Sequence, residues 1–286
     1  RVGTNFSILQ YVLYRKLTFY IAHTKMEKTF LYIDILGFKN LVTSNTDKVE
    51  SIFKIIDSLH VHKDIAFQTI VFSDTILVFN KDNRYPLHFY VTYLIEYAQQ
   101  LFYRLSMINV YFKGIITLKP FTYIELKNVN AYYGEALIST YQDEKELKGF
   151  GLYIDKSISN DAFIFEKIGF NEKYDYILLC QSLIKLYKKT KGKLPVSESL
   201  LTETDEYYRI DEDIRFFREI DYYRKHINND HIIEKYDYVY NKYRLLLPNF
   251  FCVFEKEGFL PWVIIPNYTG SINPFDILAE SELKSK

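Results

Sequence analysis

Two apolar segments in the first third of the chain each carry one carboxylate that could bind a metal ion. Asp34 lies in residues 31–38, which read LYIDILGF, and Asp74 lies in residues 70–79, which read IVFSDTILVF. A carboxylate in or beside a buried strand is unfavourable unless a cation or a hydrogen-bond network compensates its charge. Magnesium prefers one or two carboxylates together with substrate phosphates and water. If the two segments pair as antiparallel strands, they predict a two-metal site for phosphoryl transfer.

The turn after the first segment, formed by Leu36, Gly37 and Phe38, is a candidate phosphate-binding element. A glycine between a strand and a helix lets backbone amides and the helix N-terminus face an anion such as a polyphosphate. In the second segment, Ser73 and Asp74 form either a tight turn or a bulge in mid-strand. We expect both turns to contact a substrate.

Apolar periodicity predicts the elements that position these residues. Strands are expected at 30–36, 66–71, 75–79, 111–118, 121–126 and 152–154, and helices at 39–59, 87–107 and 134–146. The order strand, helix, strand, strand, helix, strand predicts an α+β fold with a ferredoxin-like βαββαβ core and helices packed on one face.

The pattern changes after Asp155. Helical spacing runs from 176 to 189, residues 214–247 predict one or two amphipathic helices, and residues 250–254 resemble a strand. We therefore expect a mainly helical extension at 158–286, either a separate domain or a layer against a catalytic domain at 26–157. Residues 1–25 are expected to be an N-terminal extension that adds little to this core, or a basic amphipathic interface helix.

Composition narrows the classes of function. The 286 residues include 36 basic and 36 acidic side chains, so no general electrostatic attraction draws the chain to nucleic acid or an anionic membrane. Cys180 and Cys252 are the only cysteines and are far apart, which argues against a disulfide scaffold or a zinc site. No segment has the roughly twenty apolar residues of a membrane span. We expect a cytoplasmic protein with no nucleic-acid or membrane partner.

These motifs resemble those of a known family. Residues 33–38, with Asp34, Gly37 and Phe38, resemble the first metal motif of class III nucleotidyl cyclases, and residues 72–76 resemble the second. Residues 112–116 resemble the strand with a basic phosphate contact, although Lys113 stands where the family usually has Arg. Residues 134–141 resemble the glycine-initiated helix that completes the site from the partner subunit. Across residues 29–157 the chain is most similar to the pyrimidine cyclases of bacterial anti-phage Pycsar systems.

The resemblance implies a homodimer with active sites at its interface. Two magnesium or manganese ions per site would be held by Asp34, Asp74 and the carbonyl of Ile35. The reaction would convert a ribonucleoside triphosphate to a 3′,5′-cyclic monophosphate and pyrophosphate, and a separate effector protein would sense the product. The catalytic residues would be Asp34, Asp74, Lys113 and Tyr141. Substrate would contact Ile35, Leu36, Gly37, Phe38, Ile70, Ser73, Ala131, Glu135 and Ser139.

Departures from the family pattern bear on the substrate. Purine cyclases usually place Lys or Glu where this chain has Ile70 and a polar residue where it has Ala131. We therefore expect a pyrimidine substrate, with UTP favoured over CTP. The family's catalytic Asn and Arg fall on or near Ile138 and Gln142, so Glu135, Ser139 or Tyr141 would contribute instead.

Alternative interpretations remain open. The chain could be a purine cyclase acting on ATP or GTP, or a degenerate cyclase fold that senses a nucleotide without turnover. A polymerase-like nucleotidyltransferase that acts on nucleic acid would use the same two-metal mechanism. The neutral net charge of the chain argues against such an enzyme, because it provides no general attraction to nucleic acid. Single residues have structural interpretations too. Lys113 could be a solubilising charge on an edge strand, Tyr141 could pack in the core, and Asp155 is more typical of a turn than of a third metal ligand.

Overall fold

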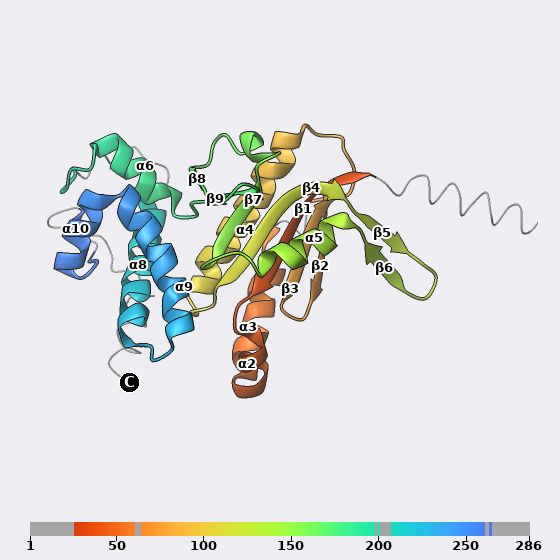
Figure 1. The fold of residues 1–286 in the computed structure, drawn as a ribbon, viewed down its shortest axis with the longest axis horizontal. Helices are drawn as coiled ribbons and strands as arrows, with labels where there is room; N and C mark the ends of the chain where they lie inside the picture. Colours follow the sequence, from red (N-terminus) through yellow and green to blue (C-terminus); the bar gives the residue numbers. More distant parts are fainter. Residues whose placement is uncertain (1–25, 61–63, 198–199, 201–206, 261–262, 265–286) are drawn as a thin grey trace, which may run out of the picture. The chain divides into compact units, whose positions relative to one another are not determined.

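The computed structural model describes residues 26–60, 64–197, 200, 207–260 and 263–264; the expected N-terminal extension lies outside them. A seven-stranded sheet has the spatial order β2-β3-β1-β4-β7-β9-β8, and β5 and β6 form a separate hairpin (Figure 1). The strands are β1 (Glu27–Ile35), β2 (Phe67–Phe72), β3 (Thr75–Asn80), β4 (Phe112–Pro120), β5 (Thr122–Glu125), β6 (Asn130–Tyr133), β7 (Gly151–Asp155), β8 (Lys167–Gly169) and β9 (Tyr174–Ile177). The helices are α2 (Phe38–Ser44), α3 (Thr46–Asp57), α4 (Leu87–Ser106), α5 (Glu135–Glu144), η2 (Ser159–Asp161), α6 (Gln181–Thr190), α8 (Tyr207–His226), α9 (Asp230–Leu246) and α10 (Pro248–Glu257).

Strand β1 lies between β3 and β4 and pairs antiparallel with both. Its register places Asp34 opposite Thr75 on one side and opposite Lys113 on the other. Strands β4 and β7 form a parallel pair, and the other pairs in this sheet are antiparallel. The chain order βαββαβ and the spatial order β2-β3-β1-β4 are those of a ferredoxin-like unit, so the predicted α+β fold class is confirmed.

Both faces of β1 are covered in its central part, because residues 29–33 are all buried. Phe30 and Tyr32 pack with Ala136 of α5, whereas Leu31 and Ile33 point to the opposite face by the alternation of a strand. Helices α3 and α4 contact each other behind the sheet in Figure 1, and α5 crosses in front. The two helices of the βαββαβ unit therefore share one face as predicted, and α5 adds a layer on the other.

Several predicted elements differ in the structure. The helix expected at 39–59 is divided at Asn45, whose side-chain oxygen accepts a hydrogen bond from the amide of Lys48 (3.0 Å) and so caps α3. The strand expected at 121–126 is shortened to one arm of the β5–β6 hairpin. Residues 174–177 are a strand before α6 begins, and residues 250–254 are helical, within α10.

The chain divides into two compact units. The first contains the sheet, continues to Gln181 and also includes residues 227–239, so it extends beyond the boundary expected at residue 157. The second comprises residues 182–226 and 240 onward. In its core, the ring of Phe217 lies 4.9 Å from Tyr243 and 5.0 Å from Phe251, measured between centroids. The described helices of this unit are α6, α8, the part of α9 from Tyr240 onward, and α10.

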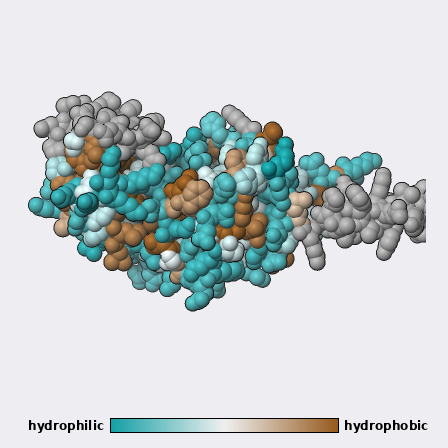
Figure 2. Space-filling model, turned by 90° about the horizontal axis from the view of Figure 1, so that it is seen from above, coloured by the Kyte–Doolittle hydropathy of each residue, from teal (hydrophilic) through white to brown (hydrophobic). Residues whose placement is uncertain are grey.

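The surface is mainly hydrophilic on the side that Figure 2 shows, with apolar side chains exposed in patches. Within the described ranges, no helix has both the length and the hydropathy required to cross a membrane.

Replacing Gly134 with alanine is expected to displace α5. The φ of Gly134 is +155°, and an added Cβ would lie 2.4 Å from the carbonyl oxygen of Pro120 and 2.7 Å from the Cα of Phe121. Both atoms are backbone, so relief requires a main-chain shift, and we expect the melting temperature to fall by about 5–10 °C. Thermal unfolding monitored by circular dichroism measures this change. Gly169→Ala is the control because its Cβ meets nothing within 4 Å; equal losses in the two variants would refute the steric argument.

Candidate active site

Asp34 and Asp74 lie at the same end of neighbouring strands. Asp34 is the penultimate residue of β1, and Asp74 belongs to the tight turn between β2 and β3, where Ser73 adopts a left-handed conformation (φ 55°). The amide of Ile35 donates a hydrogen bond to the carbonyl oxygen of Asp74 (2.9 Å). The antiparallel pairing that the two-metal hypothesis requires is confirmed, and Ser73 and Asp74 form a turn rather than a bulge.

The charge of Asp34 is poorly compensated by the protein. Burial, followed by the negative charges of Glu144 and Asp74, raises the pKa of Asp34 to about 7. Lys113 and Lys235 act in the opposite direction without cancelling this effect. A divalent cation would supply the missing positive charge, and carboxylate and carbonyl oxygens are the donors that magnesium and manganese prefer. Asp34, Asp74 and the carbonyl of Ile35 therefore fit such an ion.

In the described part of the chain, no group of three or more His, Cys, Asp and Glu side chains is placed to hold a metal. Asp34 and Asp74 thus provide two carboxylates, which is fewer ligands than a site needs to surround a metal ion with protein atoms alone. Magnesium usually keeps several waters or substrate phosphates in addition to one or two carboxylates. The pair is consistent with a site that takes its remaining ligands from a phosphorylated substrate.

Lys113 is buried beside this pair. It lies directly opposite Asp34 on the inner strand β4, so the interpretation of Lys113 as an edge-strand charge is wrong. Its ammonium group contacts Oε1 of Glu144 (3.0 Å) and the carbonyl oxygen of the same residue (3.1 Å), and the two side chains are 8% and 14% exposed. In this structure Lys113 is therefore engaged by Glu144.

Sequence reasoning did not find Glu144, although a signal was present. Ala136, Thr140 and Glu144 follow one another at intervals of four residues and so share one face of α5. Ala136 and Thr140 are fully buried, which identifies that face as the one packed on the sheet. A carboxylate continuing a buried helical face indicates a buried cationic partner.

Replacing Lys113 with methionine is expected to destabilise the fold by about 3 kcal/mol, because it leaves Glu144 partly buried and unpaired near Asp34 and Asp74. Chemical denaturation followed by circular dichroism provides the measurement. Lys119→Met is a matched control on the same strand, since Lys119 pairs at 3.4 Å with Glu135, whose side chain is 63% exposed. We expect about 0–1 kcal/mol from that variant. Similar losses at both lysines would contradict a buried ion pair at Lys113.

The turn after β1 offers backbone groups rather than side chains. Gly37 has a left-handed conformation (φ 73°) and precedes α2. The amide of Leu36 donates to the carbonyl oxygen of Tyr111 (2.9 Å), so it is engaged within the fold. The Phe38 ring is buried and packs edge-on against Phe53 (6.0 Å between centroids). The first amides of a helix have no partner within it, so those at the start of α2 are the candidates for a phosphate contact.

The two positions expected to read the base lie on different elements. Ile70, on β2, packs against the apolar cluster that contains Tyr32 and Leu77 and that also contacts α5. Ala131, on β6, is half-buried opposite Ile124 in the hairpin. Neither side chain can donate or accept a hydrogen bond.

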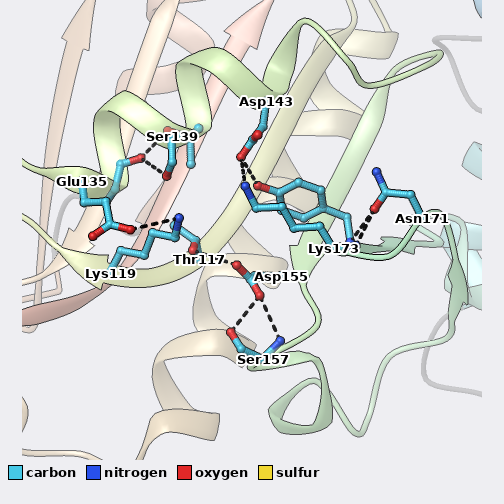
Figure 3. A network of polar contacts seen from close by, with 12 residues as sticks. Thr117, Lys119, Glu135, Ser139, Asp143, Asp155, Ser157, Asn171 and Lys173 are labelled. Carbon is cyan, nitrogen blue, oxygen red and sulfur yellow. Dashed lines mark hydrogen bonds and ion pairs between the residues drawn. The ribbon is translucent and has the colours of Figure 1, made fainter.

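Three residues of α5 were expected to contribute to the site, and Figure 3 labels two of them, Glu135 and Ser139. Glu135 pairs with Lys119, and the hydroxyl of Ser139 donates to the carbonyl oxygen of Ala136 (3.4 Å). Tyr141 is 54% exposed, with the ammonium group of Lys145 lying 4.4 Å from its ring centroid. The interpretation of Tyr141 as core packing is therefore wrong.

A polar network fixes the end of α5 to the sheet. Asp143 accepts hydrogen bonds from Lys173 and from the hydroxyl of Tyr174 (2.6 Å), the first residue of β9 (Figure 3). Asp143 directly precedes Glu144. The hydrogen bonds of Asp143 therefore help to keep Glu144 in contact with Lys113.

Asp155 belongs to the same view. Its Oδ1 accepts from the amide (2.9 Å) and hydroxyl (2.8 Å) of Ser157, and its Oδ2 accepts from Thr117 (3.3 Å). Asp155 is a turn-former, as the sequence indicated.

Three solved structures to which this chain is similar, at low sequence identity, are of nucleotidyl cyclases. The guanylyl cyclase domain of the RhoGC fusion protein from the aquatic fungus Blastocladiella emersonii is 14% identical and has a TM-score of 0.41, over 54% of this chain and 95% of that domain. A bacterial light-regulated adenylyl cyclase is 12% identical, with a TM-score of 0.42 over 59% and 99%. The adenylyl cyclase CyaB from P. aeruginosa is 10% identical, with a TM-score of 0.40 over 54% and 94%. No family model and no curated protein matches the chain.

Proposed function

We propose that the protein is a metal-dependent nucleotidyl cyclase that converts a ribonucleoside triphosphate to its 3′,5′-cyclic monophosphate and pyrophosphate. The observation that carries this proposal is the pair Asp34 and Asp74, held at one end of neighbouring strands by the hydrogen bond from Ile35 to Asp74. The motifs around both residues resemble the metal motifs of class III cyclases. The half-buried, poorly compensated charge of Asp34 supports a cation at this place.

In this proposal Asp34, Asp74 and the carbonyl of Ile35 bind magnesium or manganese, two ions per site. When bound, the metal supplies positive charge that lowers the pKa of the ribose 3′-hydroxyl and neutralises the triphosphate. The turn at Gly37 directs backbone amides toward the phosphates, and Lys113 contributes a cation from β4. Lys113 forms an ion pair with Glu144. The substrate phosphates must therefore either displace Glu144 from Lys113 or interact with the Lys113 charge without direct contact.

The reaction forms one bond and breaks another. The ribose 3′-oxygen bonds to the α-phosphorus, the bond from that phosphorus to the bridging oxygen of the β-phosphate breaks, and pyrophosphate departs. The proton of the 3′-hydroxyl passes to solvent. Positioning and charge neutralisation can supply most of the rate, so the mechanism requires no dedicated side-chain base.

We propose a pyrimidine triphosphate as substrate, UTP in preference to CTP. Ile70 and Ala131 support this choice because neither can form the hydrogen bonds by which a polar side chain would read a purine. Ile70 is also packed in an apolar cluster, so a polar side chain at this position would need a new partner. The same resemblance that favours a pyrimidine suggests that the product is a second messenger in anti-phage defence, sensed by a separate effector protein.

We propose that two copies assemble, each completing the other's site with Glu135, Ser139 and Tyr141. Exposed side chains on α5 and beside the Asp74 turn support this arrangement: Ile138 is 60% exposed, Tyr141 54% and Phe72 69%. A closed twofold pair would cover such apolar side chains on both copies.

Incubation with UTP, CTP, ATP and GTP separately, with magnesium or manganese, tests this function. Mass spectrometry of the products identifies the reaction and the base together. Cyclic UMP or cyclic CMP is the expected product, and a cyclic purine nucleotide would favour the alternative of an adenylyl or guanylyl cyclase. If every nucleotide is returned unchanged while binding persists, the protein is a nucleotide sensor and the proposed activity is wrong.

A further inference from the structure

The start of α9 belongs to the unit that contains the sheet, although it lies far from the sheet in sequence. Residues 227–239 group with residues up to Gln181, whereas the rest of α9 groups with the other helices. The ring of Tyr236 packs edge-on against Tyr111 (5.6 Å) and Phe150 (5.5 Å), measured between centroids. This part of α9 is thus anchored on the segments that lead into β4 and β7.

The anchor is close to the candidate active site. Tyr111 contacts Tyr236 through its ring, and its carbonyl oxygen accepts the hydrogen bond from Leu36, two residues after Asp34. Lys113 follows Tyr111 by two residues on β4. Tyr111 therefore links Tyr236 both to the turn that follows Asp34 and to the strand that carries Lys113.

Gly149 shows how closely α9 approaches. A Cβ added at Gly149 would lie 2.6 Å from the ring of Tyr238 and 3.1 Å from Val239. The absence of a side chain at Gly149 therefore allows this part of α9 to sit directly on the loop between α5 and β7. That loop begins just after Glu144, the partner of Lys113.

Lys235 precedes the anchor and is half-buried. Its charge interacts with Asp34, Glu144 and Lys113, and its pKa is lowered, first by burial and then by the charge of Lys113. Lys113 is engaged by Glu144 at 3.0 Å, whereas Lys235 has no ion pair or hydrogen bond within the residues that the structure describes. The three N–H donors of Lys235 thus remain available to an anion.

We propose that Lys235 is a phosphate-binding residue of this active site, supplied by the C-terminal half of the same chain. This rests on the proposed function for the identity of its ligand, the triphosphate of the nucleotide. Metal ions would offset the charges of Asp34 and Asp74, but Lys113 is already engaged by Glu144 and so is not free to contact the phosphates directly. A second cation from α9 gives the phosphates a direct partner and gives the C-terminal half a role in catalysis.

Binding of inorganic tripolyphosphate in the presence of magnesium, measured by isothermal titration calorimetry on the full chain, tests this role. We expect Lys235→Gln to bind at least about tenfold more weakly than wild type, since a hydrogen bond to a charged group is lost. Lys235→Arg should remain close to wild type because it keeps the charge. Lys242→Gln, on the same helix but in the second unit, is the matched control and should bind normally.

The melting temperature of each variant, recorded alongside, separates binding from folding. Wild-type affinity in Lys235→Gln, an equal loss in Lys242→Gln, or a failure of Lys235→Arg to bind while it remains folded would each overturn the proposal. So would the absence of tripolyphosphate binding by the wild type. If tripolyphosphate binds through Lys235 but no nucleotide is cyclised, the proposed function fails while the role of Lys235 stands.

Discussion

Asp74→Asn is expected to lower turnover by at least about a hundredfold, because it removes a metal-binding charge from the two-carboxylate site. Asparagine has the same shape as aspartate, and the hydrogen bond from Ile35 to residue 74 uses the main-chain carbonyl. The β2–β3 turn should therefore survive the substitution. We expect the variant to melt normally and to retain the oligomeric state of the wild type, as judged by size-exclusion chromatography with light scattering.

Asp47→Asn is the matched control for this experiment. Asp47 is an exposed carboxylate in the first turn of α3, in the same compact unit as Asp74. It should leave the rate of product formation unchanged. Full activity in Asp74→Asn would remove the basis of the metal site, and a similar loss in Asp47→Asn would show that the effect is not local to the site.

Asp34→Asn is expected to abolish activity and at the same time stabilise the metal-free protein at alkaline pH. The pKa of Asp34 is about 7 in the folded protein against an ordinary value of 3.8, because of burial and the charges of Glu144 and Asp74. Between these values the unfolded chain releases a proton that the folded chain retains. The contribution of Asp34 to stability therefore falls as pH rises from about 4 to about 7.

Thermal melts of wild type and Asp34→Asn, from pH 4 to pH 8 with a chelator present, measure this effect. The two curves should meet near pH 4 and separate as pH rises, with the variant more stable above pH 7. Addition of magnesium at pH 8 should raise the melting temperature of wild type and not that of the variant. If the melting temperatures of the two proteins differed by the same amount at every pH, the charge of Asp34 would not be destabilising in the metal-free protein, and the argument for a cation at this residue would fail.

The core of the fold could be predicted from sequence because its signals are local. β1 and β3 are continuous apolar segments, and α4 has a long helical period, so their types and approximate bounds were predicted correctly. The pairing of Asp34 with the Asp74 turn followed from placing two such strands side by side. Phe250, Phe251 and Phe254 were misinterpreted as a strand because a short aromatic segment fits either element. Their spacing of one and three residues is helical, and α10 buries all three.

The missed parts of the site depend on distant packing. The shared helical face of Ala136, Thr140 and Glu144 indicates a buried partner for Glu144, but its pairing with Lys113 also depends on contacts between α5 and β9, such as that of Asp143 with Tyr174, which no local pattern predicts. Lys235 reaches the site only because the first half of α9 groups with the sheet. The break at Asn45 was missed because a single side-chain cap ends one helical period and begins the next.

A titration with manganese in the absence of nucleotide, followed by electron paramagnetic resonance, tests most directly whether Asp34 and Asp74 together form a metal site. Free manganese gives a strong signal that decreases on binding, so affinity is measured without turnover. We expect wild type to bind manganese and both Asp34→Asn and Asp74→Asn to bind at least about tenfold more weakly, since each lacks one charged ligand. Wild-type affinity in both variants would show that the two carboxylates do not hold the metal.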